Sequence, residues 1–387
     1  MVIVQDIWNA LGGLLLVILA IEILPNLWKE VSRRIRYGTQ RKADYRALAD
    51  AYEGADWVRQ YYVDFWRLRI DWAPHVGGRM RPFQAPGITI DEGGLRRTWA
   101  PEGKRGSAPA KRVYAFGGST MLGAGVRDEE TVPSLLAQRL ADAGHDVELV
   151  NYGQPAYTAI QSFITFSEEI ARGNVPHVAL FLDGQNEAIT AEQSGRAGTV
   201  FNADSRAEEL NLLQPWRRGD LIRHALHAVL PRIMRRYQTL EEAIKPASRD
   251  QPVLTAENIG PLSREVARRY LDNLRHIRAV AEDNGVQTLF FWQPILFTKK
   301  HLTDHEARYQ HDGAPVPELR APLFRAVYGA LTSDPDFRSM PGAVDISGLF
   351  DDTPEPRFID PFHLAEKGNA AVAEAMLPHV VAVLEKS

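Results

Sequence analysis

The sequence predicts an α/β fold in which a parallel β-sheet is covered by helices on both faces. From residue 113 onward, short apolar runs of strand length alternate with longer segments of helical period. Glycine follows three of the predicted helices, at Gly144, Gly173 and Gly285, as is common at helix carboxyl ends. This alternation favours parallel strands joined by helical crossovers.

The individual elements follow from the same pattern. The run that begins at Val113 is apolar with a β-branched start, and it stops at two glycines, as expected of a buried strand. The last predicted helix contains Pro378 and should break or kink there, because proline removes a helical hydrogen bond. The expected strands are 113–116, 147–151, 178–182, 286–292 and 343–346, and the expected helices are 131–143, 159–172, 263–284 and 365–384.

The amino-terminal segment predicts a membrane anchor over residues 1–28. Between residues 7 and 28 the chain is almost entirely apolar, and Trp8 and Trp28 stand near the two ends. A spanning helix needs roughly 20 mostly apolar residues, and tryptophan is enriched at the two membrane interfaces. The segment reaches that length provided that Glu22 lies near an interface.

The segment 29–110 is expected to lie outside the main domain, which we place at 111–387. It begins with a basic stretch suited to a headgroup surface. Residues 43–69 then have the spacing of one amphipathic helix. A Gly-, Pro- and Arg-rich part follows, and within it residues 88–95 suggest a hairpin with glycines in its turn.

An insertion of about 188–261 interrupts the main domain. It is charged and punctuated by proline. Within it, residues 221–236 form a basic amphipathic piece. This piece suits a lid, a second membrane contact or a solvated helix packed on the domain.

His301 and His305 stand four residues apart, with Glu306 and His311 close by. A metal site is conceivable, but the glutamate placement of a zinc protease motif is absent. We therefore expect a charged surface loop here.

Composition excludes several classes of function. The net charge is −4, so no overall basic field indicates a nucleic-acid partner. The chain has no cysteine, which excludes disulfides, thiolate metal sites and a cysteine nucleophile. The absence of cysteine does not fix the compartment, because such a protein is stable in either redox environment.

Polar residues follow the ends of the predicted strands and occur again near the carboxyl terminus. Ser119 follows the first strand, Gly153 the second and Asn186 the third, while Asp360 and His363 lie near the end of the chain. Because the carboxyl ends of parallel strands meet at one edge of a sheet, these residues can converge on one pocket.

The residue types in this set suit acyl transfer. Ser119 is the candidate nucleophile, His363 the candidate base, and Asp360 the group that orients the imidazole. Donors for an oxyanion would be the backbone N–H groups of Ser119 and Gly153 and the side-chain amide of Asn186. This chemistry requires no cofactor.

These residues resemble the SGNH, or GDSL, hydrolase family. Ser119, Gly153, Asn186 and His363 match its four blocks in chain order, and Asp360 stands three residues before the histidine. The first block is Gly-Gly-Ser-Thr rather than Gly-Asp-Ser-Leu, and the third has glutamate where aspartate is common. The resemblance covers about 111–384, apart from the large insertion, and excludes the first hundred residues.

The resemblance implies esterase, lipase or carbohydrate deacetylase chemistry on a three-layer α/β/α domain of flavodoxin-like type. We therefore expect a membrane-anchored serine esterase or acyl hydrolase that acts on O-acyl esters, for example acetyl esters, of a glycan or lipid. Two alternatives remain open. One is an O-acyltransferase that uses the same triad. The other is a non-catalytic subunit of a membrane complex, with a membrane-protein partner held through the anchor.

The sequence gives conflicting indications of which membrane face the main domain occupies. Positive charges follow the apolar segment and none precedes it, which favours a cytoplasmic domain. Resemblance favours the periplasmic side, because anchored relatives often act on exported glycans or lipids. A third arrangement has Glu22 hold the helix in one leaflet. The charges are Lys29, Arg33, Arg34, Arg36, Arg41 and Lys42.

Overall fold

The computed structural model describes residues 12–13, 16–17, 46, 49–103, 111–212, 230, 254–309 and 317–386. The expected anchor, apart from four of its residues, and the piece 221–236, apart from residue 230, lie outside them. Within the described residues, no helix has both the length and the apolar character needed to cross a bilayer. The chain divides into two compact units, one of Asp44–Asn202 with Pro252–Ser387 and one of Met1–Ala43 with Ala203–Gln251.

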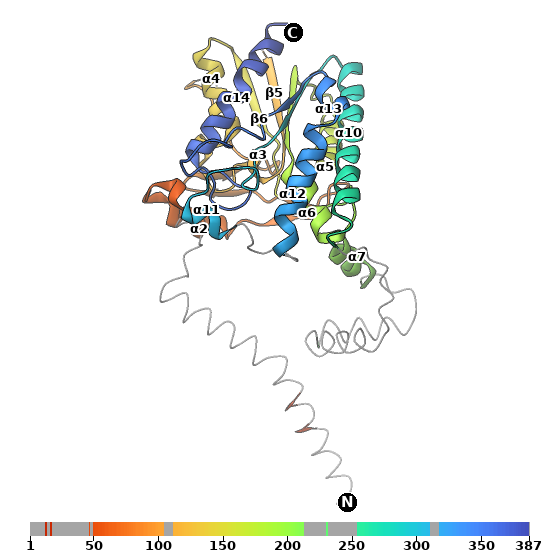
Figure 1. The fold of residues 1–387 in the computed structure, drawn as a ribbon. Coiled ribbons are helices and arrows are strands. Elements are labelled where there is room, and N and C mark those ends of the chain that lie inside the picture. Colours follow the sequence, from red (N-terminus) through yellow and green to blue (C-terminus); the bar gives the residue numbers. More distant parts are fainter. Residues whose placement is uncertain are drawn as a thin grey trace, which may run out of the picture. The chain divides into compact units, whose positions relative to one another are not determined.

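A five-stranded parallel sheet forms the centre of the larger unit (Figure 1). The strand order is β6-β5-β7-β8-β9, and every neighbouring pair is parallel. Numbered along the chain this is the order 2-1-3-4-5, the flavodoxin-like arrangement, so the predicted fold class is confirmed. The strands are β5 (Lys111–Gly117), β6 (Val147–Asn151), β7 (Val178–Asp183), β8 (Gln287–Trp292) and β9 (Ala343–Asp345).

Helices cover both faces of this sheet. On one face lie α4 (Val132–Asp142) and α14 (Glu366–Leu384), and on the other lie α5 (Ala159–Ala171), α10 (Ile259–Asp283) and α12 (Pro317–Thr332) (Figure 1). Helix α14 continues through Pro378, so the helix is not broken there. The shorter helices are η3 (Asp128–Glu130), α3 (Ser119–Leu122), α6 (Gln185–Ser194), α11 (Asp304–Arg308) and α13 (Pro335–Ser339); α7 (Ala203–Leu212) belongs to the smaller unit.

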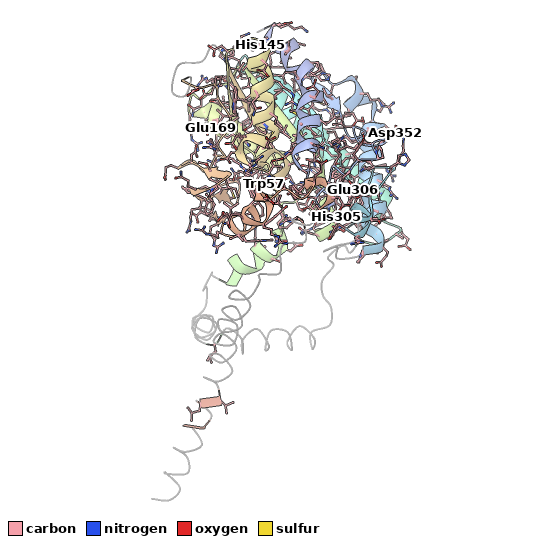
Figure 2. All side chains as sticks on the ribbon, turned by 90° about the vertical axis from the view of Figure 1, so that its left-hand side faces the viewer. Trp57, His145, Glu169, His305, Glu306 and Asp352 are labelled. Atoms are coloured by element: carbon pink, nitrogen blue, oxygen red, sulfur yellow. The ribbon has the colours of Figure 1, made fainter. Side chains whose placement is uncertain are left out.

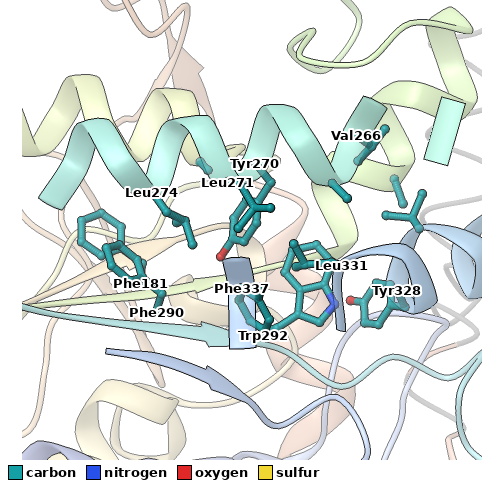
Figure 3. Close-up of a cluster of buried hydrophobic side chains, with 14 of the residues drawn as sticks. Phe181, Val266, Tyr270, Leu271, Leu274, Phe290, Trp292, Tyr328, Leu331 and Phe337 are labelled. Carbon is teal, nitrogen blue, oxygen red and sulfur yellow. The ribbon is translucent and has the colours of Figure 1, made fainter. Parts of the chain in front are cut away.

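The core on the α10 side is built from stacked aromatic rings. Phe181 of β7 stacks between Phe116 and Phe290, with ring centroids 5.1 and 5.3 Å away. Trp292 lies between Tyr270 of α10 and Tyr328 of α12, at 4.8 Å from each (Figure 3). Full burial of each such ring contributes about 1.5–3 kcal/mol. This packing fixes the carboxyl ends of β5, β7 and β8 relative to one another.

Residues 49–103 pack in the same compact unit as the sheet. The single helix expected over 43–69 is instead two pieces in its described part, η2 (Asp50–Tyr52) and α2 (Trp57–Phe65). The chain breaks between them because Glu53 and Gly54 adopt φ values of 53° and 76°. Left-handed residues of this kind end helices.

The hairpin expected over 88–95 is displaced by one strand. β4 (Ile88–Ile90) pairs with the strand before it, β3 (Phe83–Ala85). Gly94, at φ 74°, closes a tight turn in which its N–H donates to the carbonyl of Asp91 at 3.0 Å. The glycines therefore turn the chain as predicted, but the pairing across this turn is an isolated β-bridge, between Ile90 and Arg96, instead of a second strand. A further short pair is β1 (Ile70–Asp71) with β2 (Arg79–Met80).

The cluster around Glu306 is buried, so the expectation of a surface loop was wrong there. His305 and Glu306 lie in α11 with exposed fractions of 7% and 1% (Figure 2). Glu306 Oε2 accepts from Lys299 Nζ at 2.6 Å, and both side chains are fully buried. Its Oε1 accepts from the backbone N–H groups of Arg357 and Phe358. This ion pair therefore anchors the segment that leads to Asp360.

Removing one member of this pair should destabilise the fold strongly. Glu306→Ala leaves the buried ammonium of Lys299 without its carboxylate, and we expect a loss of about 3–5 kcal/mol in the free energy of unfolding. The double variant Lys299→Met/Glu306→Leu removes both charges and should be less destabilised than the single one. Unfolding in urea, followed by tryptophan fluorescence, measures both. Equal losses in the two variants would contradict a role as a buried ion pair.

Candidate active site

Two glycines bring the nucleophile loop close to its neighbours. Gly117 ends β5 at φ 151°, and a Cβ there would lie 2.4 Å from the carbonyl oxygen of Leu182. A Cβ on Gly118 would lie 2.2 Å from Nδ2 of Asn186. Real Cβ atoms do not approach so closely, so glycine is needed at both positions. Ser119 follows and begins α3 at the carboxyl end of β5.

Ser119, His363 and Asp360 form a continuous hydrogen-bonded chain. His363 Nε2 lies 2.7 Å from Ser119 Oγ, and His363 Nδ1 lies 2.7 Å from Asp360 Oδ2. Asp360 Oδ1 accepts from the backbone N–H groups of Phe362 and His363, at 2.9 and 2.8 Å. This tight turn folds the carboxylate back onto the imidazole three residues later. The three residues that the sequence singled out are thus adjacent in space.

The Asp360 carboxyl is held in its charged form. Burial alone would raise its pKa, but the neighbouring His363 ring, the cation of Arg46 and the backbone N–H of Phe362 together hold that pKa well below its usual range. A carboxylate at this position favours the imidazole tautomer with the proton on Nδ1. Nε2 is then free to accept the proton of Ser119.

Gln185 is a further contact of the nucleophile that the sequence analysis did not single out. Its Nε2 donates to Ser119 Oγ at 3.2 Å, and its Oε1 accepts from Gln293 Nε2 at 3.0 Å. Gln185 directly precedes Asn186 and begins α6, so the carboxyl end of β7 supplies two amides beside the serine. Its position immediately after the third predicted strand could have indicated a place in the site. Glutamine, however, is not one of the residue types by which the site was recognised.

Asn186 lies beside the nucleophile loop, as expected. Its Nδ2 donates one hydrogen bond, of 2.7 Å, to the carbonyl oxygen of Tyr157. An amide nitrogen carries two hydrogens, so one remains for a ligand. The backbone N–H of Ser119 opens α3 and has no acceptor within its own helix. Both groups lie next to Ser119 and can donate to a ligand there.

The N–H of Gly153, the third expected donor, is engaged elsewhere. It donates to Asn151 Oδ1 at 2.9 Å, and Asn151 Nδ2 in turn donates to the carbonyl oxygen of Met121 at 3.0 Å. A Cβ on Gly153 would lie 2.3 Å from the backbone nitrogen of Leu122. Gly153 thus permits close approach of the loop after β6 to α3. Its N–H is already hydrogen-bonded to Asn151.

Two buried carboxyl groups flank these amides. Both oxygens of Asp183 are buried without a hydrogen-bond partner among the described residues, and burial, with nearby Glu187, raises its pKa well above the usual value. Burial also raises the pKa of Glu187, to about 7, against the lowering effect of backbone donors. Those donors include the N–H groups of Ala159 and Gly184. Through these two hydrogen bonds Glu187 holds the start of α6 against the start of α5.

Within the described parts of the chain, no group of three or more histidines and carboxylates is placed to hold a metal ion. His301 is exposed whereas His305 is buried, and His311 lies outside the described residues.

No family model matches the chain, and no curated protein sequence matches it. Among solved structures, the fold is similar to that of the acetyl xylan esterase AlAXEase, at 14% identity over 70% of this chain and 99% of that one, with a TM-score of 0.36. It is also similar to Est24, a carbohydrate acetylesterase from Sinorhizobium meliloti, at 12% identity, 70% and 99% coverage and a TM-score of 0.39. A member of the lipolytic protein G-D-S-L family from Veillonella parvula gives 12% identity, 70% and 97% coverage and a TM-score of 0.38.

The burial of Asp183 should make stability depend on pH in a defined direction. The pKa of Asp183 in the folded protein is raised above an unfolded value of about 3.9. The contribution of Asp183 to the free energy of unfolding is therefore fully present below about pH 4. This contribution declines as pH rises, by up to about 1.4 kcal/mol per pH unit. Asp183→Asn stays neutral at every pH. The melting temperature of Asp183→Asn minus that of the unsubstituted protein should therefore increase as pH rises from 5 to 8.

Asp352→Asn is the matched control, because the Asp352 side chain is 81% exposed. It should show the same pH dependence as the unsubstituted protein. Thermal unfolding monitored by tryptophan fluorescence at several pH values gives the comparison. A melting temperature difference for Asp183→Asn that is constant across this range would show that Asp183 is charged in the folded protein.

Proposed function

We propose that the protein is a serine esterase of the SGNH type that forms an acyl-enzyme on Ser119. The observation that carries this proposal is the unbroken chain Ser119 Oγ, His363 Nε2, His363 Nδ1 and Asp360 Oδ2, linked by two contacts of 2.7 Å. A nucleophile bonded to a base, with the base oriented by a third group, is the arrangement that activates a serine hydroxyl.

In the first half of the reaction, Ser119 Oγ bonds to the ester carbonyl carbon while His363 Nε2 takes its proton. The carbonyl oxygen becomes an oxyanion, which accepts hydrogen bonds from the Ser119 N–H and from Asn186 Nδ2. The carbon–oxygen bond to the alcohol then breaks, and the imidazolium returns the proton to the leaving alkoxide. Asp360 stays charged throughout and stabilises the imidazolium.

In the second half, His363 takes a proton from water as the water oxygen bonds to the acyl carbon. The bond to Ser119 Oγ breaks, the serine recovers its proton from His363, and the carboxylic acid leaves. A sugar hydroxyl in place of water would give O-acyl transfer through the same intermediate. Our proposal is hydrolysis of O-acyl esters, such as acetyl esters, of a glycan or lipid, with the substrate class taken from the resemblance of the four sequence blocks.

We also propose that this esterase is attached to a membrane by residues 1–28. The support is the apolar run between Trp8 and Trp28 and the basic residues that follow it. The count of Lys and Arg favours a cytoplasmic-facing domain, with the periplasmic face as the alternative. Carboxyl-terminal reporter fusions that are active on one face only decide between the two.

The esterase proposal is tested by covalent labelling of the full chain with a fluorophosphonate. We expect one label on Ser119 and none in Ser119→Ala. Both Ser119→Ala and His363→Ala should lose nearly all nitrophenyl acetate hydrolysis, because the residues of a catalytic triad act as a unit. Asp360→Asn should retain somewhat more activity. An unlabelled Ser119 in the folded protein would favour a non-catalytic subunit. Acyl transfer to an added sugar in preference to water would favour a transferase.

The oxyanion role of Asn186 gives a separate prediction. Asn186→Ala should lower kcat by roughly 100- to 1,000-fold with little change in KM, because a donor to the oxyanion acts mainly in the transition state. Steady-state kinetics on nitrophenyl acetate measures both constants. Gly153→Ala is not a suitable comparison, because its Cβ would meet the backbone of α3. A change confined to KM would assign Asn186 to substrate binding instead.

A further inference from the structure

Arg46, in the region preceding the first strand of the main sheet, lies against the acid of the triad. Its Nη1 is 3.6 Å from Asp360 Oδ2, and the side chain is 11% exposed. That oxygen is the one bonded to His363 Nδ1. The guanidinium stands over the rings of Tyr62, Phe65 and Trp66, at 4.9, 5.5 and 5.5 Å from their centroids. Three aromatic faces and one carboxylate thus determine its position.

Tyrosines that follow Arg46 contact the turn after α3, which follows the nucleophile. Tyr52 donates its hydroxyl to the carbonyl of Gly125 at 2.6 Å and lies 2.9 Å from the hydroxyl of Tyr62. The N–H of Gly125 donates to the hydroxyl of Tyr61 at 2.9 Å. Gly125 is part of the turn that directly follows α3, the helix that begins with Ser119.

Apolar packing joins the same segment to both loops. One buried cluster contains Tyr52 and Tyr61 together with Leu122 from α3 and with Ile359, the neighbour of Asp360. The loops also meet directly, because a Cβ on Gly125 would lie 2.2 Å from Cδ1 of Ile359. Arg46 and residues 49–62 therefore contact the segment that carries the nucleophile and the segment that carries the acid and base.

We infer that Arg46 and residues 49–62 form an active-site clamp and that Arg46 within it is a positioning residue for Asp360 and His363. This inference rests on the proposed esterase mechanism and extends it to a part of the chain outside the sequence blocks that suggested it. The clamp holds Ser119 and His363 at bonding distance through the tyrosines. Arg46 restrains the carboxylate and offsets part of its charge.

The charge of Arg46 has a defined effect on the base. Among the described residues, the titratable groups beside the carboxylate and Arg46 include the His363 ring and the phenols of Tyr52 and Tyr62. Burial raises the pKa of both phenols well above the usual value, so they stay neutral. A nearby cation makes a second positive charge on the imidazole less favourable. Loss of Arg46 should therefore stabilise the protonated, inactive imidazole, so that activity appears only at a higher pH.

The test compares Arg46→Met, which removes the charge but keeps a long apolar side chain, with Arg46→Lys, which keeps the charge. Arg69→Met is the matched control, because Arg69 is exposed and its side chain bonds to carbonyls of its own segment. Each full-length variant is checked for folding by its melting temperature. Arg46→Gln is a second neutral variant in case methionine lowers that temperature.

The first readout is the pH profile of kcat/KM on nitrophenyl acetate. For Arg46→Met we expect kcat/KM to fall roughly tenfold at neutral pH, because the base is less well placed, and the acid limb to move upward by roughly half a pH unit or more. Arg46→Lys should recover most of the acid limb. Arg69→Met should match the unsubstituted protein. A folded neutral variant with an unchanged profile would overturn the inference and leave the esterase proposal intact.

The second readout does not depend on turnover. The imidazole of His363 is titrated by NMR with labelled histidine, and its signal is assigned from its absence in His363→Ala. A higher pKa in Arg46→Met supports the positioning role even if no ester is found to be cleaved. An unchanged pKa contradicts it. Failure of the unsubstituted protein to react with a fluorophosphonate would count against the proposed function alone.

Discussion

The Asp360 carboxylate is a buried charge, and the polar groups around it stabilise that charge by hydrogen bonds and by an ion pair. An isolated carboxylate would lose several kcal/mol on transfer from water to the interior. Here two backbone N–H groups, the imidazole and the guanidinium of Arg46 surround it. These same contacts fix the ring of His363. The electrostatic requirement of one residue therefore sets the geometry of the base.

A second buried ion pair, Lys299 with Glu306, stabilises the segment that leads to Asp360. Lys299 and Glu306 are fully buried, and Glu306 also binds the backbone at Arg357 and Phe358. That backbone leads within two residues to Asp360. The segment carrying the acid and base is thus held at its start by a charged pair and at its end by α14. Rigidity here suits a reaction that needs Ser119 and His363 at a fixed separation.

The sheet, and the proximity of Ser119, Asp360 and His363 at one edge of it, were predictable because both depend on local patterns. Apolar runs such as 178–182 are nearly identical to the strands observed, and polar residues after strand ends must meet at one edge of a parallel sheet. Contacts between distant segments were not predictable in this way. The pairing of Arg46 with Asp360 spans almost the whole chain, and the position of Asn151 decides whether the N–H of Gly153 is free. Helix α12, which contains Pro322, was not predicted.

The hydrogen bond between Ser119 and His363 joins residues 244 positions apart. At synthesis rates of 5–20 residues per second, the serine leaves the ribosome on the order of 10–50 s before the histidine is made. During that interval the nucleophile has no base, and its hydroxyl is no more reactive than that of any other serine. On the proposed mechanism, a nascent copy therefore cannot cleave esters until His363 has been synthesised and has reached Ser119.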